Sequence, residues 1–367
     1  MTDDDKERLS QLSQLSQQGY QLLREHMTTE ARAKFEEILA EDPENNYALV
    51  GLGDLERKER SFERAVEYYQ QCLEFHPENN YALFGLAESL RALKRFNRAV
   101  EVWERYLQYD SDNVTVLTRV GDVYRKIHNF PRSRELYLRV LDLEADNPYA
   151  LIGLGHLHYD FKEFDSARHY WERMYELRGQ DVDIRVLTSL GNCHRKLKTY
   201  EKGIPYFESA LKREPGNFYA LYGLADCYRG LQRPEESLVY WHRILEIDEK
   251  NKVILTRAGD AYRAMEDFEQ AEDYYRRALN VQFDLYAILG LAIIHRTQGR
   301  IDEAISALED LAKSSPENGR VFLELAGCYE DRGRIPEALA VLSRHVEASR
   351  SPSRFVQRKI SELKSQL

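Results

Sequence analysis

Proline, glycine and cysteine are all scarce in this sequence. Its 367 residues include 10 Pro, 19 Gly and 4 Cys, and no two cysteines stand in a CxxC pair. So few helix-breaking residues favour a largely helical chain. Few and scattered cysteines indicate a reducing compartment.

Signals for membranes are missing as well. No apolar run approaches the roughly 18 residues that a membrane span needs, and the opening MTDDDKERLSQ lacks the basic and apolar regions of a secretion signal. The net charge of −10 argues against nucleic acid or an anionic membrane as the main partner. We therefore expect a cytoplasmic protein.

The sequence is rich in internal repetition. The stretch from Asn46 to Asn79 begins NYALVGLGDLER, and the next residues begin again with NYALFGLAESLR. When Asn46 is numbered position 1, ten repeats begin at residues 12, 46, 80, 114, 148, 184, 218, 252, 285 and 319. All are 34 residues long except the repeats at 148 and 252, which have 36 and 33. A fixed period in this range predicts a solenoid.

Each repeat reads as a helix–turn–helix hairpin. Positions 4, 7, 8 and 11 form one helical stripe, and positions 17, 20, 24, 27 and 28 form a second. Asn at position 34 can N-cap the following helix, as in Asn45, and Pro at position 32 falls where the second helix must stop, as in Pro43. Residues 1–11 form a polar lead-in.

Small residues at positions 8 and 20 let the two helices approach, while position 24 fills the gap beside them. Position 24 is aromatic in the first eight repeats: Phe35, Tyr69, Trp103, Tyr137, Trp171, Phe207, Trp241 and Tyr275. We interpret these aromatic residues, including all three tryptophans, as packing anchors. The alternative is a stacking platform for bases or sugars.

This pattern resembles the tetratricopeptide repeat family, whose 34-residue hairpins carry W/L-G-Y in the first helix and A-F-A-P in the second. The resemblance covers residues 12–351, although Leu308 and Leu342 replace the aromatic residue in the last two repeats. It implies an all-α, right-handed superhelical α-solenoid of about ten helix–turn–helix repeats. Residues 352–367, with Phe355, Val356 and Leu363, are predicted to be a helix that caps the tenth repeat.

Positions 2, 5, 9 and 12 form one stripe of the first helix, beside its core stripe. The resemblance implies that this stripe lines a concave groove that holds an extended peptide or a helix of a partner protein. The candidate groove residues are Tyr47, Arg57, Tyr81, Arg91, Thr118, Arg119, Asp122, Arg125, Tyr149, Arg185, Arg195, Tyr219, Arg229, Thr256, Arg257, Asp260, Arg263, Tyr286 and Arg296.

Two readings of this stripe stay open. In the first, each acid at position 9 pairs with the arginine at position 12 of its own helix. In the second, tyrosines and guanidiniums are binding anchors. The middle repeats carry nine Lys and Arg against four Asp near the stripe, which predicts an acidic partner segment. No Lys stands at position 5, so a clamp for chaperone C-terminal tails is not expected.

A two-repeat alternation overlies the basic pattern. LTRVGDVYR at 117–125 returns as LTRAGDAYR at 255–263. We favour duplication of a two-repeat block as the origin of this alternation. The alternative is a ligand that contacts every second repeat through Thr118, Thr188 and Thr256 at position 5. The segment 179–206 carries the two extra residues, and it is either a tolerated loop variation or a hinge.

The sequence gives little support for an enzymatic activity. The chain has no GxxxxGK, no HExxH and no nucleophile elbow. His156, His158, His169 and His194 are close in sequence, but His158 and His194 occupy core positions, and a metal needs three or four converging donors. We therefore expect no catalytic residues, no cofactor and no metal site.

The favoured function is a non-catalytic scaffold or adaptor that binds a protein partner, with no nucleic acid and no membrane involved. The first alternative is a regulatory or assembly subunit that acts through self-association or through its terminal or convex face. The second is an RNA-binding helical-repeat protein, which the acidic net charge disfavours.

Overall fold

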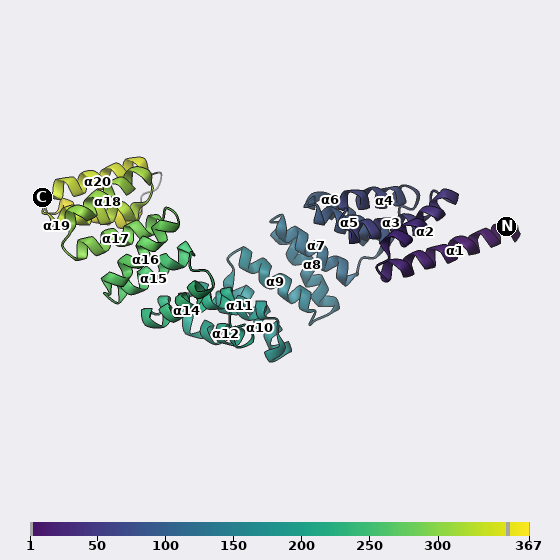
Figure 1. The fold of residues 1–367 in the computed structure, drawn as a ribbon, viewed down its shortest axis with the longest axis horizontal. Coiled ribbons are helices and arrows are strands. Elements are labelled where there is room, and N and C mark those ends of the chain that lie inside the picture. Colours follow the sequence, from purple (N-terminus) through teal and green to yellow (C-terminus); the bar gives the residue numbers. More distant parts are fainter. Residues whose placement is uncertain (1–2, 350–352, 367) are drawn as a thin grey trace. The chain divides into compact units, whose positions relative to one another are not determined.

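A computed structural model describes residues 3–349 and 353–366, and the helical segments in these ranges form ten consecutive helix–turn–helix repeats (Figure 1). Repeats two to ten start their first helices at the residues that the sequence predicts. The first helices are α1 (Asp3–Arg24), α3 (Asn46–Lys58), α5 (Asn80–Ala92), α7 (Val114–Lys126), α9 (Pro148–Asp160), α11 (Ile184–Lys196), α13 (Phe218–Gly230), α15 (Lys252–Ala264), α17 (Leu285–Thr297) and α19 (Gly319–Asp331).

The second helices start at position 17 of every repeat. They are α2 (Thr28–Glu41), α4 (Phe62–Phe75), α6 (Phe96–Tyr109), α8 (Phe130–Leu143), α10 (Phe164–Arg178), α12 (Tyr200–Arg213), α14 (Pro234–Ile247), α16 (Phe268–Val281), α18 (Ile301–Ser314) and α20 (Ile335–Ala348). No β-strand occurs within the described ranges. The predicted all-α hairpin solenoid is confirmed at this level.

Asparagine caps define where the first helices begin. The Asn45 side chain accepts a hydrogen bond from the backbone N–H of Ala48, and the same cap recurs at Asn79, Asn113, Asn147, Asn217, Asn251 and Asn318. A side-chain acceptor there satisfies a backbone donor that the helix itself leaves unpaired. The predicted capping role of position 34 is therefore confirmed.

The turn after each first helix contains one residue in the left-handed region. It falls at position 15 in every repeat, and its φ angle lies between 59° and 78°. Only Gly299 and Gly333, in the last two repeats, are glycines at this position, while Arg60 and Lys94 are examples of the L-residues that take it elsewhere. This turn was not anticipated, because only two of its ten residues are glycines.

The aromatic residue at position 24 is the centre of each repeat's core. Tyr69, Trp103 and Trp171 are examples, and all eight position-24 aromatics expose at most 1% of their surface. Tyr69 is held between Gly53 of its own repeat and Gly85, at position 6 of the next repeat: a Cβ atom on either glycine would lie under 3 Å from the ring. The packing role predicted for the aromatics is confirmed.

Position 6 explains the two-repeat alternation. A repeat with Phe or Tyr at position 24 is followed by a repeat with Gly at position 6, as Tyr137 is followed by Gly153. A repeat with Trp at position 24 is followed by a larger residue there, as Trp103 is followed by Arg119. The alternation therefore matches the way the aromatic ring of one repeat packs against the next, and it needs no ligand.

The chain divides into two compact units, Met1–Val182 and Asp183–Leu367, which we call the N-terminal and C-terminal units. The boundary coincides with the two extra residues of the fifth repeat, where Gly179–Asp181 forms a 3₁₀ turn, η1, and Gly179 has φ 55°. In α12, Gly203 and Pro205 lie inside one continuous helix. Gly203 is needed there, because a Cβ would lie 3.0 Å from the carbonyl oxygen of Gly191. Whether 179–206 is a hinge stays a prediction.

The two ends of the repeat array differ from its middle. Helix α1 already begins at Asp3, so the described part of the polar lead-in at 1–11 is helical; residues 1 and 2 lie outside the described residues. At the other end, α21 (Arg354–Lys364) buries Val356 and Leu363 in the cluster formed by α17–α20. Within the predicted capping helix 352–367, residues 352 and 367 lie outside the described residues, as do residues 350 and 351 of the predicted array.

Candidate functional site

Tyrosines at position 2 stand at the start of the first helices with their side chains in solvent. Tyr47, Tyr81, Tyr149, Tyr219 and Tyr286 are between 59% and 80% exposed, whereas the aromatic residues at position 24 are buried. Together with positions 5, 9 and 12 these tyrosines form the surface that we call the tyrosine face, and each unit carries its own stretch of it. Exposed aromatic rings that recur on one face are typical of binding surfaces.

The arginines of the tyrosine face are paired with carboxylates. Within a single helix, Arg57 lies 2.9 Å from Asp54, Arg91 2.7 Å from Glu88 and Arg229 2.7 Å from Asp226. The pairing within one helix that the sequence suggested is therefore present. These guanidiniums are therefore less available as binding anchors for a partner, because each already has a carboxylate partner.

Other arginines of the face reach across to the next repeat. Arg125 binds Asp160 at 2.7 Å as well as lying 3.8 Å from Asp122. Arg296 lies 2.6 Å from Asp331. The remaining candidate arginines also have a carboxylate within 4.0 Å: Arg119 has Glu88, Arg185 has Asp183, Arg195 has Asp226, Arg257 has Asp260 and Arg263 has Asp260. The excess of basic residues in the sequence does not appear as a row of unpaired cations on this face.

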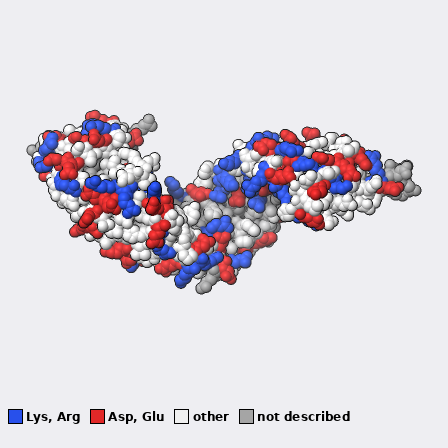
Figure 2. All heavy atoms as spheres, viewed as in Figure 1, with Lys and Arg blue, Asp and Glu red and all other residues white. Residues whose placement is uncertain are grey.

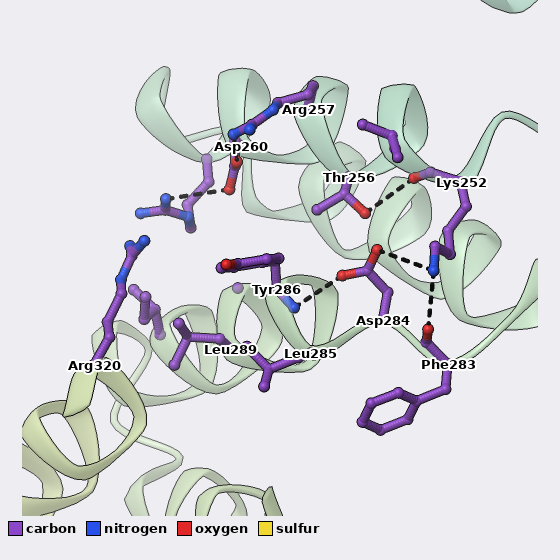
Figure 3. Close-up of a pocket in the computed structure, with 14 residues that line it drawn as sticks. Lys252, Thr256, Arg257, Asp260, Phe283, Asp284, Leu285, Tyr286, Leu289 and Arg320 are labelled. Carbon is purple, nitrogen blue, oxygen red and sulfur yellow. Dashed lines mark hydrogen bonds and ion pairs between the residues drawn. The ribbon is translucent and has the colours of Figure 1, made fainter. Parts of the chain in front are cut away.

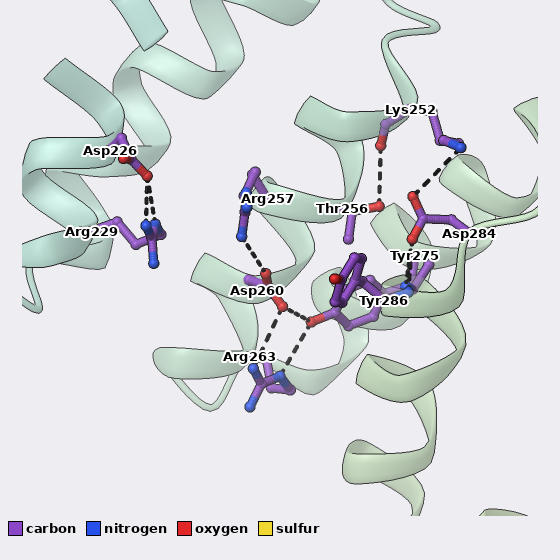
Figure 4. Close-up of polar contacts among 11 residues, drawn as sticks. Asp226, Arg229, Lys252, Thr256, Arg257, Asp260, Arg263, Tyr275, Asp284 and Tyr286 are labelled. Carbon is purple, nitrogen blue, oxygen red and sulfur yellow. Dashed lines mark hydrogen bonds and ion pairs between the residues drawn. The ribbon is translucent and has the colours of Figure 1, made fainter. Parts of the chain in front are cut away.

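Asp226 is the most enclosed of these carboxylates and holds two repeats together. It is 6% exposed and lies 2.7 Å from both Arg195, in the preceding repeat, and Arg229, on its own helix (Figure 4 shows the Arg229 contact). Burial alone would raise the pKa of Asp226, but hydrogen bonds from Arg195 and Arg229 outweigh burial and lower that pKa below its ordinary value. Asp226 is therefore a structural link and not a proton donor.

Tyrosine hydroxyls from the core also reach the acids of this face. Tyr275, at position 24, donates a 2.8 Å hydrogen bond to Asp260, which Arg257 and Arg263 approach from either side (Figure 4). Tyr69 and Tyr137 make the same contact, with Asp54 and Asp122, at 2.7 Å. Sequence reasoning missed this link, although Asp at position 9 and Tyr at position 24 occur together in these three repeats.

The position-5 threonines bond to their own helices. The Thr118 hydroxyl donates to the carbonyl of Val114 at 2.5 Å, and the Thr256 hydroxyl donates to Lys252 at 3.1 Å. Thr188 donates to Arg185 at 3.1 Å, and both Thr188 and Thr256 are buried. Because these hydroxyls donate to their own helices, they add little to a ligand-binding surface.

A groove follows the tyrosine face in the C-terminal unit. It has a volume of about 470 Å³, lies between α15, α17 and the start of α19, and contains the Tyr286 ring in its middle (Figure 3). Leu289 and Ile293 contribute apolar side chains to its lining, and Arg320 stands at one end (Figure 3). This arrangement can hold a side chain or a short backbone segment between two neighbouring first helices.

A second groove follows the tyrosine face in the N-terminal unit. It has a volume of about 740 Å³ and is lined by Tyr20, Tyr47 and Tyr81 from α1, α3 and α5, with Val50 and Asp54 between them. The Tyr20 hydroxyl donates a 3.0 Å hydrogen bond to the carbonyl of Tyr47, which fixes its ring against the next repeat. Tyr20 was not among the predicted groove residues, because position 9 carries mostly acids in the other repeats.

The histidines that the sequence singled out have structural partners. His158 binds Glu163 at 2.5 Å and stacks on Tyr170, and His194 binds Thr199 at 2.9 Å and stacks on Tyr206. No group of three or more His, Cys, Asp or Glu side chains in the described ranges is arranged to hold a metal ion. Position 11 accepts His in place of Tyr because a flat ring can stack there.

Comparison with family models identifies the repeat. A tetratricopeptide repeat model matches residues 17–74, 52–114, 119–182 and 289–352, and two further models of the same description match 217–282 and 184–217. The chain belongs to the tetratricopeptide repeat (TPR) family. Members of this family are generally protein–protein interaction scaffolds, and the TPR fold is typically non-catalytic.

Solved structures with similar folds include another TPR repeat-containing protein. The C-terminal part of a TPR repeat-containing protein from Cytophaga hutchinsonii has a TM-score of 0.58 at 18% identity, covering 66% of this chain and 99% of that one. The pilF protein of Pseudomonas aeruginosa has a TM-score of 0.49 at 20% identity, covering 58% and 96%. Yeast Tom70 has a TM-score of 0.44 at 15% identity, covering 97% and 96%. At such identities the likeness concerns the fold alone.

The search of curated proteins found no match. Among the helices in the described part of this TPR chain, none combines the length and the apolar character that crossing a membrane requires.

Proposed function

We propose that this TPR protein is a non-catalytic scaffold that binds an extended or helical segment of a partner protein along the tyrosine face. The observation that carries the proposal is the contrast between two sets of aromatic residues. Tyrosines at position 2 are at least 59% exposed, while the aromatics at position 24 are buried. The core does not use the position-2 rings, so they are available to a partner.

The paired charges support this role because they order the side chains around the tyrosines. Asp260 is held by Arg257, Arg263 and Tyr275 on one side of the groove that contains Tyr286. Side chains that are already ordered lose little conformational entropy when a partner binds. The paired arginines still offer outward N–H groups, because a guanidinium has five donors.

The partner segment that fits is therefore one with apolar or aromatic side chains and exposed backbone carbonyls. The tyrosine rings supply contact area and hydroxyl hydrogen bonds, and they carry only two rotatable side-chain angles. An acidic partner gains less on this face than the sequence suggested, since the guanidiniums have carboxylate partners. We place the scaffold in the cytoplasm, with no nucleic acid and no membrane as its ligand.

Selection of peptides from a random library by the purified chain tests the proposal. The selected peptides should bind wild type in a titration and lose at least tenfold in affinity to Y81S/Y149S or to Y219S/Y286S, depending on the unit that they occupy. The matched control is Tyr109→Ser, since Tyr109 is 46% exposed but lies at the end of a second helix, α6. Equal affinity for wild type and both double variants would show that the tyrosine face is not the binding surface.

A further inference from the structure

A second surface stands out at the turns inside repeats two, three and four of the N-terminal unit. The segments 57–64, 91–98 and 125–132 contain eleven Lys and Arg and only two acidic residues. Residues 1–182 as a whole contain 24 Lys and Arg against 34 Asp and Glu. We call six of the exposed cations of these turns the basic edge: Lys58, Arg60, Lys94, Arg95, Arg98 and Lys126; a seventh, Arg64, pairs with Glu56 at 3.0 Å and is not counted. Figure 2 shows Lys and Arg side chains gathered over the α6–α8 part of this unit.

Most cations of the basic edge lack the carboxylate partners that the arginines of the tyrosine face have. Among the described residues, none forms an ion pair or a side-chain hydrogen bond with Arg60, Lys94, Arg95 or Arg98. Lys58 donates to a backbone carbonyl, that of Leu23, at 2.5 Å. Lys126 lies 5.6 Å from the centre of the Phe96 ring. No carboxylate of the described residues therefore pairs with the cations of this edge.

The backbone of these turns does not dictate the choice of a cation. Arg60 and Lys94 occupy the left-handed turn position with φ angles of 63° and 59°. An L-residue with a Cβ atom costs about 1–2 kcal/mol in this region, whereas glycine is tolerated. Gly299 and Gly333 take the same turn in the last two repeats. Gln232 and Glu266 also take this turn, with φ angles of 59° and 60°, so the turn itself does not require a cation.

Acidic residues gather at the opposite end of the hairpins. The connections from one repeat to the next carry Asp42 and Glu44, Asp110 and Asp112, and Glu144 and Asp146. A hairpin places its internal turn at one end and its two outer helix termini at the other. The N-terminal unit thus carries its cations and its acids on different edges, which orients an approaching charged partner.

We propose that the basic edge docks an acidic segment of a partner protein, at a site separate from the tyrosine face. Equivalent residues of neighbouring repeats are about 10 Å apart, because packed helices lie 8–10 Å from each other. An extended chain rises about 3.3 Å per residue, so carboxylates at every third residue match the repeat spacing. The acidic partner that the sequence suggested for the arginines of the tyrosine face therefore fits this edge better.

Nucleic acid is the competing occupant, and the charge distribution disfavours it. A phosphate backbone presents a continuous row of negative charges well beyond the three repeats of the basic edge. Outside the segments 57–64, 91–98 and 125–132, the N-terminal unit carries 32 Asp and Glu against 13 Lys and Arg. A long polyanion would meet those acids, whereas a short acidic peptide would not.

Fluorescence anisotropy with the purified full chain tests the proposal. The probe is a labelled 20-residue peptide with Glu or Asp at every third position, and the reference probe carries Gln and Asn at the same positions. Wild type should bind the acidic peptide at least tenfold more tightly than the reference in 50 mM salt, and the affinity should fall at least tenfold at 300 mM because the contact is electrostatic. K94E/R95E/R98E should lose at least tenfold in affinity for the acidic peptide.

Two control variants make the result specific to this edge. K212E/K250E/R354E reverses three exposed cations elsewhere on the chain and should change the affinity less than twofold. Y81S/Y149S should leave it unchanged, which separates this proposal from that of the tyrosine face. Equal binding of both peptides by wild type, equal loss in the two charge-reversal variants, or tighter binding of a 20-nucleotide single-stranded RNA would each overturn the proposal.

Discussion

Replacing Gly85 by alanine tests the packing that spaces consecutive repeats. Gly85 lies inside α5, and a Cβ atom there would come to 2.2 Å from Cζ, 2.5 Å from Cε1 and 2.6 Å from the hydroxyl of Tyr69. The Tyr69 ring is completely buried, so it has no open space into which it can turn. Its hydroxyl also donates a 2.7 Å hydrogen bond to Asp54, which a displaced ring would weaken.

The expected cost follows from three contributions. Overpacking a close-packed core costs about 1–3 kcal/mol, and weakening the hydrogen bond costs about 1 kcal/mol more. Alanine in place of glycine favours the helix by about 1 kcal/mol. The net prediction is a loss of about 1–3 kcal/mol in the free energy of unfolding, opposite in sign to the change expected from helix propensity alone.

Urea unfolding followed by circular dichroism measures this loss, and a double-mutant cycle assigns it. In a Y69L background the ring is gone, so G85A should cost at least about 1 kcal/mol less than in wild type. The control is Gly216→Ala, whose Cβ would lie 3.8 Å from Ile247, an ordinary contact. An unchanged or increased stability of G85A, or the same cost in both backgrounds, would refute the reasoning.

Three other predictions concern charge, thiols and the turns. Asp226→Asn should lower stability at neutral pH by about 1–3 kcal/mol, because the buried carboxylate that accepts hydrogen bonds from Arg195 and Arg229 is lost. Because the pKa of Asp226 is lowered in the folded state, the wild type keeps the stability that this carboxylate contributes above about pH 4 and loses it as the pH falls further. Acid unfolding should therefore be less steep in the variant. Identical pH profiles of the two proteins would contradict the role given to Asp226. Burial raises the pKa of the Cys72 and Cys328 thiols to about 11, so a disulfide reagent at pH 8 should label them only after unfolding, and rapid labelling of the native chain would contradict this. Lys94→Gly should raise the unfolding free energy by up to about 1 kcal/mol by relieving the left-handed turn while weakening binding of the acidic peptide, and a destabilised variant would count against the strain argument.

Sequence periodicity predicted the repeat geometry well for a physical reason. Each hairpin is bounded by short-range signals, such as the Asn45 and Asn79 caps and the prolines at position 32, which act within a few residues. The small and aromatic positions are also local, since Tyr69 and Gly53 belong to one hairpin. Local rules of this kind can be read from one chain without knowing how the repeats stack.

Features that depend on stacking could not be read in the same way. Arg125 takes Asp160 and Arg195 takes Asp226 from the following repeat, so the charge balance of the stripe was misjudged as an excess of free cations. The role of Gly85 at position 6 was missed because its partner, Tyr69, belongs to the preceding repeat. The left-handed turn at position 15 was missed because residues other than glycine occupy it in eight of the ten repeats.

Hydrogen–deuterium exchange with and without a library-selected peptide tests the central claim, that the protein binds its partner through the tyrosine face. Exchange should slow in the first helices of the occupied unit, such as α3 and α5 or α15 and α17, and stay unchanged in the second helices. Y81S/Y149S or Y219S/Y286S should abolish that protection. Protection confined to second helices, or protection that survives both double variants, would contradict the claim.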